Sequence, residues 1–490
     1  MTTWLPDPSH YPEQMTPLSA TVWFEALGNG LHEAMRELRG PFGGFRSRTD
    51  LGWAYECVLP PEWEHEPEGV RAAALALGET WEERYRPRVW EITRELWDQR
   101  PELPAPPEAA ALFDRMWELV QEQWTIHFLT VVPAQIAAEI FNDRYVELFG
   151  AGDPLAPYRL LERAAAERGD DEIDQLAGRA RELRVDHLLR EHAPEHALAR
   201  LAELASGRVW LDELRAYLHP LGGAAGRVRW HELSLPREIE FPALTLEAVR
   251  LRLDREPPPV LPPPHVPEPL AELFSPVAAA YRLKETHSYH IDYPGLLATR
   301  DVLRAFGRRL AAEGLVADVD DVWMLERTEL REALVAPGRG LRALVVARRA
   351  ELEQGLRDGP KPYLGDPPAE TERHLALEKF YGSAGASLAG AGASPGIGEG
   401  IARVVSSIGD FGRVEPGDVL VAATTTPAWT PLFDSLAALV TETGGILSHA
   451  AIVAREYGIP AVVGAAGAMS AIPDGARVRV DGATGEITIL

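Results

Sequence analysis

Apolar residues recur at every third or fourth position along most of the chain from about residue 66 to residue 345. The pattern is clearest in "PEGVRAAALALGETWEERYRPRVWEITRELWDQ" and in the long stretch that begins at "EAAALFDRMWELV". This spacing places apolar side chains on one face of a helix, so it predicts a mainly helical region. Two shorter segments, "LSATVWFEAL" and "WAYECVLPP", fit either a strand or the edge of a helix, and their type stays open.

Two segments interrupt this periodicity. Residues 254–269, "DREPPPVLPPPHVPEP", are rich in proline, which lacks a backbone donor and clashes with a preceding helical turn. We therefore expect an extended connector inside the helical part. Residues 382–400 consist almost wholly of Gly, Ala and Ser, a composition typical of flexible linkers, and we place a hinge at 381–395.

The pattern changes after the hinge to short runs rich in Val and Ile, separated by short helical pieces. The segment "VDGATGEI" has the composition of a hairpin turn between two strands. The sequence thus predicts a multidomain protein, with a large mainly α-helical domain over residues 1–380 followed by a small α/β domain over residues 396–490.

Composition narrows the classes of partner and location. The 490 residues include 74 acidic and 49 basic side chains, a net charge of −25, so nucleic acid and anionic membranes are poor partners. A single cysteine, Cys57, excludes an internal disulfide framework and a multi-cysteine metal site, and we assign no metal to the chain. The N-terminus lacks the basic and apolar regions of a signal peptide, and no uninterrupted apolar run reaches membrane-spanning length. We expect a soluble, cytoplasmic protein.

The segment "GGILSHAAIVAREYGIP", residues 444–460, carries the chemistry that stands out most. Ser448 suits a helix N-cap, good helix formers follow it, Gly458 can adopt the left-handed C-terminal conformation, and Pro460 forbids continuation. This pattern places His449 in the first turn of a short helix.

Unpaired amides and the positive end of the helix dipole favour an anion at this position and disfavour an imidazolium. A neutral imidazole nitrogen is a competent nucleophile toward phosphate, and Gly444 and Gly445 allow the backbone to approach a phosphoryl group closely. The alternative interpretation of His449 is a histidine that only caps the helix or packs in a core.

This segment resembles the mobile phosphohistidine domain of the phosphoenolpyruvate-utilising enzymes. That family's motif is a glycine pair, three further residues, His-Ala-Ala, two aliphatic residues and Ala-Arg. This chain has the glycine pair at Gly444 and Gly445 and the run from His449 to Arg455 in the same register. The chain departs from the dikinase motif at Leu447, where dikinases carry threonine. The upstream segments "ATTTPAWTPLFDSL" and "GASPGIGEGIARVV" are also similar to the family, so the resemblance covers residues 396–490.

The resemblance implies that His449 is phosphorylated and that neighbouring residues support the phosphate, namely Gly444, Gly445, Ser448, Arg455 and Thr425. The helical region is similar, more weakly, to the substrate-binding domain of the rifampicin phosphotransferase branch, through residues 11–27, 282–315 and 318–334. Family members with this activity carry an ATP-grasp domain, which this sequence does not show. The resemblance therefore implies that ATP and Mg²⁺ bind a separate ATP-grasp subunit, and we assign no cofactor to this chain itself.

Two groups of residues are candidates for the acceptor site. His287, His290 and Asp292 are expected near a helix end, where one histidine could deprotonate an acceptor hydroxyl and Asp292 could orient it. The alternative is a polar helix face that meets solvent. Arg46 and Arg48 follow a glycine pair and could clamp a phosphate, or could lie in a solvated turn.

The function expected from the sequence is a phosphotransferase component. His449 takes a phosphoryl group from ATP on the partner and passes it to a hydroxyl of a small organic molecule in the helical domain. One alternative is a phosphocarrier or regulatory protein without its own small-molecule acceptor. Another is an ATP-driven dehydratase, in which the phosphorylated hydroxyl is eliminated.

Overall fold

The computed structural model describes most of the chain. The described residues are 3–6, 11, 13–98, 106–150, 152–153, 155–165, 171–219, 232–254, 264–336, 341–367, 389–406, 412–425, 429–433, 435–446 and 448–490. They form two compact units, each assembled from several segments. Unit 1 contains Met1–Ala137, Arg229–Leu235 and Thr286–Ala369, and unit 2 contains Ala138–Val228, Pro236–Glu285 and Glu370–Leu490.

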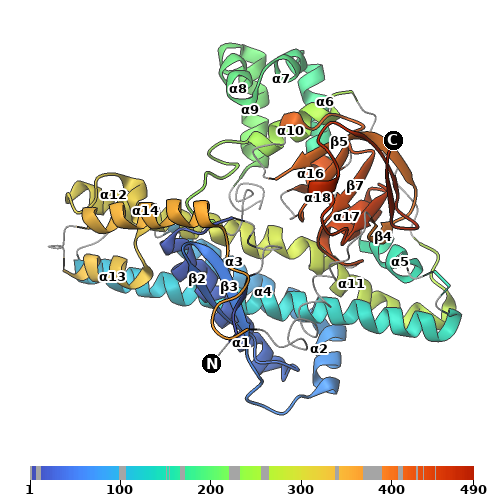
Figure 1. Ribbon diagram of the computed structural model, residues 1–490, viewed down its shortest axis with the longest axis horizontal. Coiled ribbons are helices and arrows are strands. Elements are labelled where there is room, and N and C mark those ends of the chain that lie inside the picture. Colours follow the sequence, from blue (N-terminus) through green and yellow to red (C-terminus); the bar gives the residue numbers. More distant parts are fainter. Residues whose placement is uncertain are drawn as a thin grey trace. The chain divides into compact units, whose positions relative to one another are not determined.

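Unit 1 combines helices with a small antiparallel sheet (Figure 1). Its strands, in the order β1-β3-β2, are β1 Leu5–Pro6, β2 Phe45–Asp50 and β3 Trp53–Val58. Its helices are α1 Glu25–Leu38, α2 Pro67–Thr80, α3 Arg86–Asp98, α12 Tyr293–Ala312, α13 Arg327–Val335 and α14 Arg342–Asp358. The sequence left open whether two segments were strand or helix, and the structure assigns both. The segment "WAYECV" forms β3, and "SATVWF" forms a helical turn that leads into α1.

The long helix α4, Pro106–Phe149, runs through both units, and its first part forms the centre of unit 1. The ring of Trp124 meets that of Trp23 edge to face at 5.1 Å. A Cβ atom at Gly30 of α1 would lie 2.6 Å from the backbone of Trp124, and one at Gly295 of α12 would lie 1.9 Å from the Gln123 side chain. The two glycines therefore let α1 and α12 approach this part of α4 closely.

Helix α11, Ala271–His287, continues into α12 through a π-helical turn, Ser288–Asp292. The sequence had placed these residues at a helix end, and the structure corrects this to the interior of a long helical stretch. The turn accommodates Pro294, which cannot donate a helical hydrogen bond. The side-chain amide of Gln123 donates to the Ile291 carbonyl at 2.5 Å, which fixes the turn against α4.

Unit 2 contains helices α5 to α11, the end of α4, and a curled sheet (Figure 1). The new helices are α5 Ala156–Ala165, α6 Asp171–Glu182, α7 Asp186–Glu191, α8 Pro194–Glu203, α9 Ala205–Tyr217 and α10 Ala243–Arg252. Buried residues of α6 to α10 form a core of their own, in which the indole of Trp210 donates to the Leu176 carbonyl at 2.9 Å.

The sheet of unit 2 has seven strands in the order β10-β9-β5-β6-β7-β8-β4. The strands are β4 Ala391–Ser394, β5 Ile397–Val405, β6 Val419–Ala422, β7 Ala438–Thr441, β8 Ala461–Val463, β9 Arg477–Asp481 and β10 Glu486–Ile489, with helices α16 Thr430–Phe433, α17 His449–Glu456 and α18 Ala468–Ala471 between them. Strands β5 to β8 are parallel, and the pairs at both edges are antiparallel. The expected hairpin is confirmed as β9–β10. A bridge between Ala389 and Glu486 connects the two edges.

The units differ from the two domains expected from the sequence. Leu244 and Leu251 of α10 share a hydrophobic core with Phe433 and Leu436 of the sheet region. Helices that the sequence assigned to one domain, residues 1–380, are therefore divided between the units.

The two predicted connectors fall partly outside the described residues. Of the hinge at 381–395, residues 381–388 are not described, and Ala391–Ser394 form β4, paired with β8, where a flexible segment was expected. The sheet thus begins before residue 396. Of the proline-rich connector, residues 255–263 are not described, and Glu268–Leu270 form a 3₁₀ turn.

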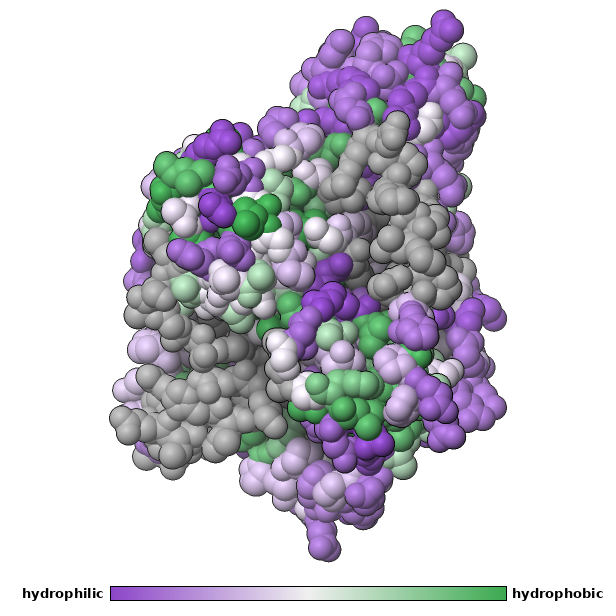
Figure 2. All heavy atoms as spheres, turned by 90° about the vertical axis from the view of Figure 1, so that its right-hand side faces the viewer, coloured by the Kyte–Doolittle hydropathy of each residue, from purple (hydrophilic) through white to green (hydrophobic). Residues whose placement is uncertain are grey.

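Helix α4 contains a segment of membrane-spanning length, although no such segment was expected from the sequence. Within α4, Glu108–Phe149 is long and apolar enough to cross a membrane by length and composition, but 61% of its most apolar window is buried inside the protein, as in a core helix. Figure 2, which looks at the right-hand side of Figure 1, shows hydrophilic side chains over much of that face, with smaller clusters of apolar ones between them. The buried core, not this face, holds most large apolar side chains.

A buried ion pair joins helix α17 to helix α5 within unit 2. The Arg455 guanidinium donates from Nε to Oε1 of Glu162 at 2.5 Å, and the side chains are only 1% and 3% exposed. The Tyr281 hydroxyl donates to the same Glu162 oxygen at 3.2 Å. Because each charge is removed from water, each depends on the other for its stability.

We predict that Glu162→Ala lowers the free energy of unfolding of unit 2 by about 3–5 kcal/mol, because it leaves the Arg455 charge buried and unpaired. Urea unfolding, followed by tryptophan fluorescence, measures the change. The matched control is Glu33→Ala, which breaks the exposed Glu33–Arg36 pair and should shift the transition far less. An equal shift in both variants would contradict the prediction.

Candidate functional site

The glycine turn between β7 and α17 forms as the sequence predicts. Ser448 has an extended backbone, with φ −68° and ψ 159°, and its Oγ accepts a long hydrogen bond of 3.4 Å from the amide of Ala451. Helix α17 begins at His449, and Gly458 just beyond its end has the left-handed φ of +67°. The cap, the helix and its stop are therefore encoded locally.

The two glycines of the turn have different roles. Gly444 has φ +99°, a conformation that L-residues rarely adopt, and a Cβ atom there would lie 2.9 Å from the Ser448 side chain. A Cβ atom at Gly445 would have no neighbour within 4 Å. Gly444 is thus required by the fold, whereas the space beside Gly445 is open.

The His449 side chain is partly buried in the first turn of α17, and its ring centroid lies 6.1 Å from that of Phe433, with an interplanar angle of 33°. The first amides of a helix have no intrahelical acceptor, so they offer donors to an anion beside this ring. The arrangement suits an imidazole that acquires negative charge.

Thr425 lies on the loop after β6, beside the glycine turn after β7. The amide and hydroxyl of Thr443 both donate to the Ala423 carbonyl, at 3.0 and 2.9 Å, and hold the two loops together. The Thr425 side chain is only 6% exposed, and its hydroxyl has no hydrogen-bonding partner in the part of the chain that the structure describes. A buried hydroxyl without a partner is costly, so this group is available to a ligand.

Arg455 stabilises the glycine turn through hydrogen bonds to the backbone. Its Nη1 donates to the carbonyls of Ile446 and Ala393, at 2.8 and 3.0 Å, while its Nε pairs with Glu162. These contacts engage the guanidinium with the backbone of the turn and with α5. That Arg455 also supports the phosphate, as the resemblance implies, stays a prediction.

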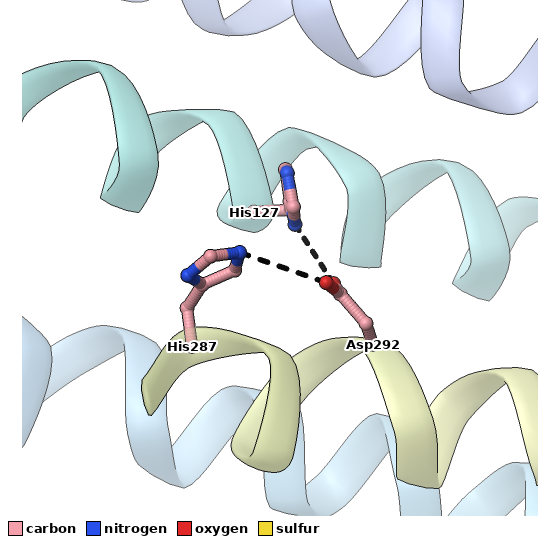
Figure 3. Close-up of side chains that lie close together, drawn as sticks. All are labelled: His127, His287 and Asp292. Atoms are coloured by element: carbon pink, nitrogen blue, oxygen red, sulfur yellow. Dashed lines mark hydrogen bonds and ion pairs between the residues drawn. The ribbon is translucent and has the colours of Figure 1, made fainter. Parts of the chain in front are cut away.

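A second cluster lies in unit 1, where His127 of α4 meets His287 and Asp292 (Figure 3). His127 Nδ1 lies 2.7 Å from Oδ1 of Asp292, and His287 Nε2 lies 3.6 Å from Oδ2. The two imidazole rings meet edge to face at 4.8 Å. The structure therefore brings together two of the three predicted residues and adds His127.

His127 is not among the residues that the sequence predicts for this site, although a signal is present. Gln123 and His127 are polar, lie four positions apart and occupy a face of α4 that is otherwise apolar. Polar residues with this spacing on a buried helix face indicate a partner on the opposing helix, here the turn Ser288–Asp292.

The Asp292 side chain is 6% exposed. Burial by itself would raise the pKa of its carboxyl group, but the positive charge that His127 carries when protonated and its hydrogen bond oppose this effect, as do His287 and Ser288. The net result is a pKa below the usual value for aspartate, so Asp292 is ionised at neutral pH.

The remaining candidates lie elsewhere. His290 is exposed, and its ring lies 5.7 Å from that of Trp81. Arg46 and Arg48 are exposed on strand β2, not in a turn, and the Arg48 guanidinium lies 5.4 Å from the Trp4 ring. No interaction of either arginine with the cluster of His127, His287 and Asp292 occurs among the described residues.

The cluster also has the composition of a metal site. His127, His287 and Asp292 each offer one ligand atom, and these atoms lie within 4.8 Å of one another. Two imidazoles and a carboxylate form a ligand set that transition metals use. The 2.7 Å contact between His127 and Asp292, however, is the length of a direct hydrogen bond.

Comparison with known proteins gives a family for the sheet region. Residues 414–485 match the family described as "PEP-utilising enzyme, mobile domain", and this stretch contains the glycine turn, His449 and Thr425.

Several curated proteins are similar over longer stretches. Chondramide synthase cmdD of Chondromyces crocatus is 29% identical over 99% of this chain, which corresponds to 14% of that protein. The uncharacterized phosphotransferase YvkC of Bacillus subtilis is 38% identical over 42% of this chain and 26% of its own length. A rifampicin phosphotransferase of Bacillus cereus is 50% identical over 21% of this chain and 12% of its own length.

The chain thus spans about a quarter or less of the length of each of these relatives. The similarity to phosphotransferases agrees with the motif around His449, and the family match lies on the same residues. Residues 414–485 therefore match the mobile-domain family of PEP-utilising enzymes, and the chain is similar in part to rifampicin phosphotransferases.

Proposed function

We propose that this chain is the carrier and acceptor-binding component of a phosphotransferase. His449 takes up a phosphoryl group and passes it to a hydroxyl of a small organic molecule. The observation that carries this proposal is the place of His449, partly exposed in the first turn of α17, within the stretch that matches the mobile domain.

The geometry suits both steps of a relay. A neutral ring nitrogen attacks a donor phosphorus atom, the bond from phosphorus to the leaving oxygen breaks, and the donor leaves with the electron pair. The phosphohistidine dianion would face the amides of the glycine turn and of α17, which favour negative charge. The Thr425 hydroxyl is one further donor available to it.

The donor in this proposal is ATP with Mg²⁺, bound by a separate ATP-grasp subunit, and the relay operates in the cytoplasm. The relatives named as phosphotransferases are several times longer than the stretches that align, so most of their length lies outside the alignment. The acceptor is proposed to bind unit 1, and the name of the Bacillus cereus relative makes rifampicin the first compound to test.

The cluster of His127, His287 and Asp292 favours acceptor chemistry over a pure carrier or regulatory protein. A buried, ionised carboxylate that orients an imidazole is an arrangement that handles protons, which a protein-docking surface does not need. If the product retains the phosphoryl group, the reaction is transfer, and if it lacks both phosphate and hydroxyl, the reaction is a dehydration.

We predict that the chain gains one acid-labile phosphoryl group when incubated with ATP, Mg²⁺ and an ATP-grasp protein encoded beside it. His449→Asn should abolish the label, because no other imidazole lies in the glycine turn. Intact-mass spectrometry before and after mild acid treatment measures the label.

His187→Asn on α7 is the matched control, because it removes a histidine from unit 2 outside the sheet and should leave the label unchanged. Full labelling of His449→Asn would refute the proposed carrier. Donor compounds other than ATP, including phosphoenolpyruvate, are run in parallel to identify the source.

We predict that Gly445→Ala and Gly444→Ala separate the phosphate site from the fold. Gly445→Ala should unfold like the native chain, because its Cβ atom has no neighbour within 4 Å. It should nevertheless slow formation of phosphohistidine about tenfold or more, because the added methyl group obstructs the backbone amides of the glycine turn. Gly444→Ala should cost about 1–3 kcal/mol of stability, because of its positive φ. Thermal unfolding and the labelling rate measure both effects, and normal labelling of Gly445→Ala would exclude a phosphate at this turn.

A further inference from the structure

We propose that His127 is the base that removes the proton from the acceptor hydroxyl, and that Asp292 is the residue that positions it. The proposal rests on the function proposed above and adds the residue at which acceptor chemistry occurs. The two side chains come from α4 and from the π-helical turn, 165 positions apart in the sequence, so the fold alone assembles them.

The contact between the two residues fixes the tautomer of His127. An ionised carboxylate can only accept a hydrogen bond, so Nδ1 of His127 must carry the proton that points to Oδ1 of Asp292, 2.7 Å away. In the neutral ring the other nitrogen, Nε2, then carries a lone pair. The lone pair is what a general base requires.

The Nε2 atom of His127 has no hydrogen-bonding partner among the described residues. Figure 3 shows it pointing away from the Asp292 carboxylate. The contacts of His127 within the described parts of the chain are the hydrogen bond to Asp292 and the rings of Trp124, Phe128 and His287, and none of them engages Nε2 in a hydrogen bond.

His287 is the weaker candidate for the base. Its Nε2 lies 3.6 Å from Asp292, beyond hydrogen-bonding distance, and 3.3 Å from the Ser288 hydroxyl. The contact of His287 with the carboxylate is therefore longer than that of His127. His287 instead lies edge to face with the His127 ring, where it restricts the rotation of that ring.

The apolar surroundings of His127 and Asp292 strengthen the electrostatic attraction between the two side chains. Asp292 and His127 are 6% and 9% exposed, and the rings of Trp124 and Phe128 lie 4.8 Å from the His127 ring. In such apolar surroundings the attraction between the carboxylate and a newly formed imidazolium is larger than in water. Asp292 is thus placed to stabilise the imidazolium that the proposed step forms.

In the proposed transfer step, the phosphoryl group moves from the His449 nitrogen to the acceptor oxygen. The acceptor oxygen forms a bond to phosphorus while its proton passes to Nε2 of His127, and the bond from phosphorus to the His449 nitrogen breaks with its electron pair on that nitrogen. The His449 ring takes up one proton from solvent, and His127 releases one to solvent. The net change is movement of one phosphoryl group from His449 to the hydroxyl.

The test uses the full chain phosphorylated on His449 by phosphoramidate, which phosphorylates imidazoles chemically and makes the experiment independent of any partner subunit. Acceptors are rifampicin and a panel of phenols, primary alcohols, sugars and hydroxy acids. The single-turnover rate of discharge is measured against acceptor concentration, and the background rate of His449→Asn is subtracted. The compound that discharges the native chain fastest is used for the variants His127→Gln, Asp292→Asn, His287→Gln and His290→Gln.

We predict that His127→Gln and Asp292→Asn lower the maximal discharge rate by about 10²–10⁴-fold, with little change in the acceptor concentration that gives half the maximal rate. Asp292→Asn acts through the tautomer of His127. An amide can donate a hydrogen bond to Nδ1, which places the ring proton on Nε2 and removes the lone pair from that atom. His287→Gln should have a much smaller effect, and the exposed His290→Gln should have none. Phosphorylation of His449 should be normal in all four variants, and thermal unfolding verifies that each is folded.

Three results would overturn the assignment. The first is normal discharge in His127→Gln or Asp292→Asn. The second is an equal loss in His287→Gln together with inhibition by a chelator and recovery with Zn²⁺, which would make the cluster a metal site. The third is the absence of discharge by every acceptor. Failure to phosphorylate His449 is a separate result, because it would refute the proposed carrier and not the base.

Discussion

The positive φ of Gly444 is the backbone constraint on which the carrier site depends. Gly444 follows β7, which ends at Thr441, and turns the chain so that Ser448 caps α17 and His449 occupies the first helical turn. Arg455, in the last turn of the same helix, donates to the Ile446 carbonyl and so fixes the glycine turn. The reactive ring therefore owes its position to a backbone conformation that few residues other than glycine adopt.

The Arg455–Glu162 pair extends this constraint to the helices of unit 2. A guanidinium with this little exposure is tolerated only because Glu162, Tyr281 and two backbone carbonyls surround it. The pair thus links the helix that carries His449 to α5, a helix nearly 300 positions away in the sequence. Any movement of α17 relative to α5 would have to separate two buried charges or be compensated by new partners.

The cluster of His127, His287 and Asp292 depends on a different kind of constraint, the close packing of helices. Gly295 permits α12 to lie against Gln123, and Gln123 in turn fixes the π-helical turn through the Ile291 carbonyl. Asp292 is thereby brought to hydrogen-bonding distance of His127, one turn further along α4. A polar pair can persist in this core because each member satisfies the other.

The sequence by itself determined the features that depend on neighbouring residues. The cap at Ser448, the helix from His449, the stop at Gly458 and the hairpin near the C-terminus all follow from local conformational preference, and each is confirmed. The motif also placed His449 in the stretch that matches the mobile-domain family. Only the tertiary structure decided what depends on residues far apart, namely the grouping of helices with the sheet, the strand at 391–394, the burial of Arg455 against Glu162 and the meeting of His127 with Asp292. Periodicity reports which face of a helix is buried but not which partner it meets, and that choice is made by packing across hundreds of residues.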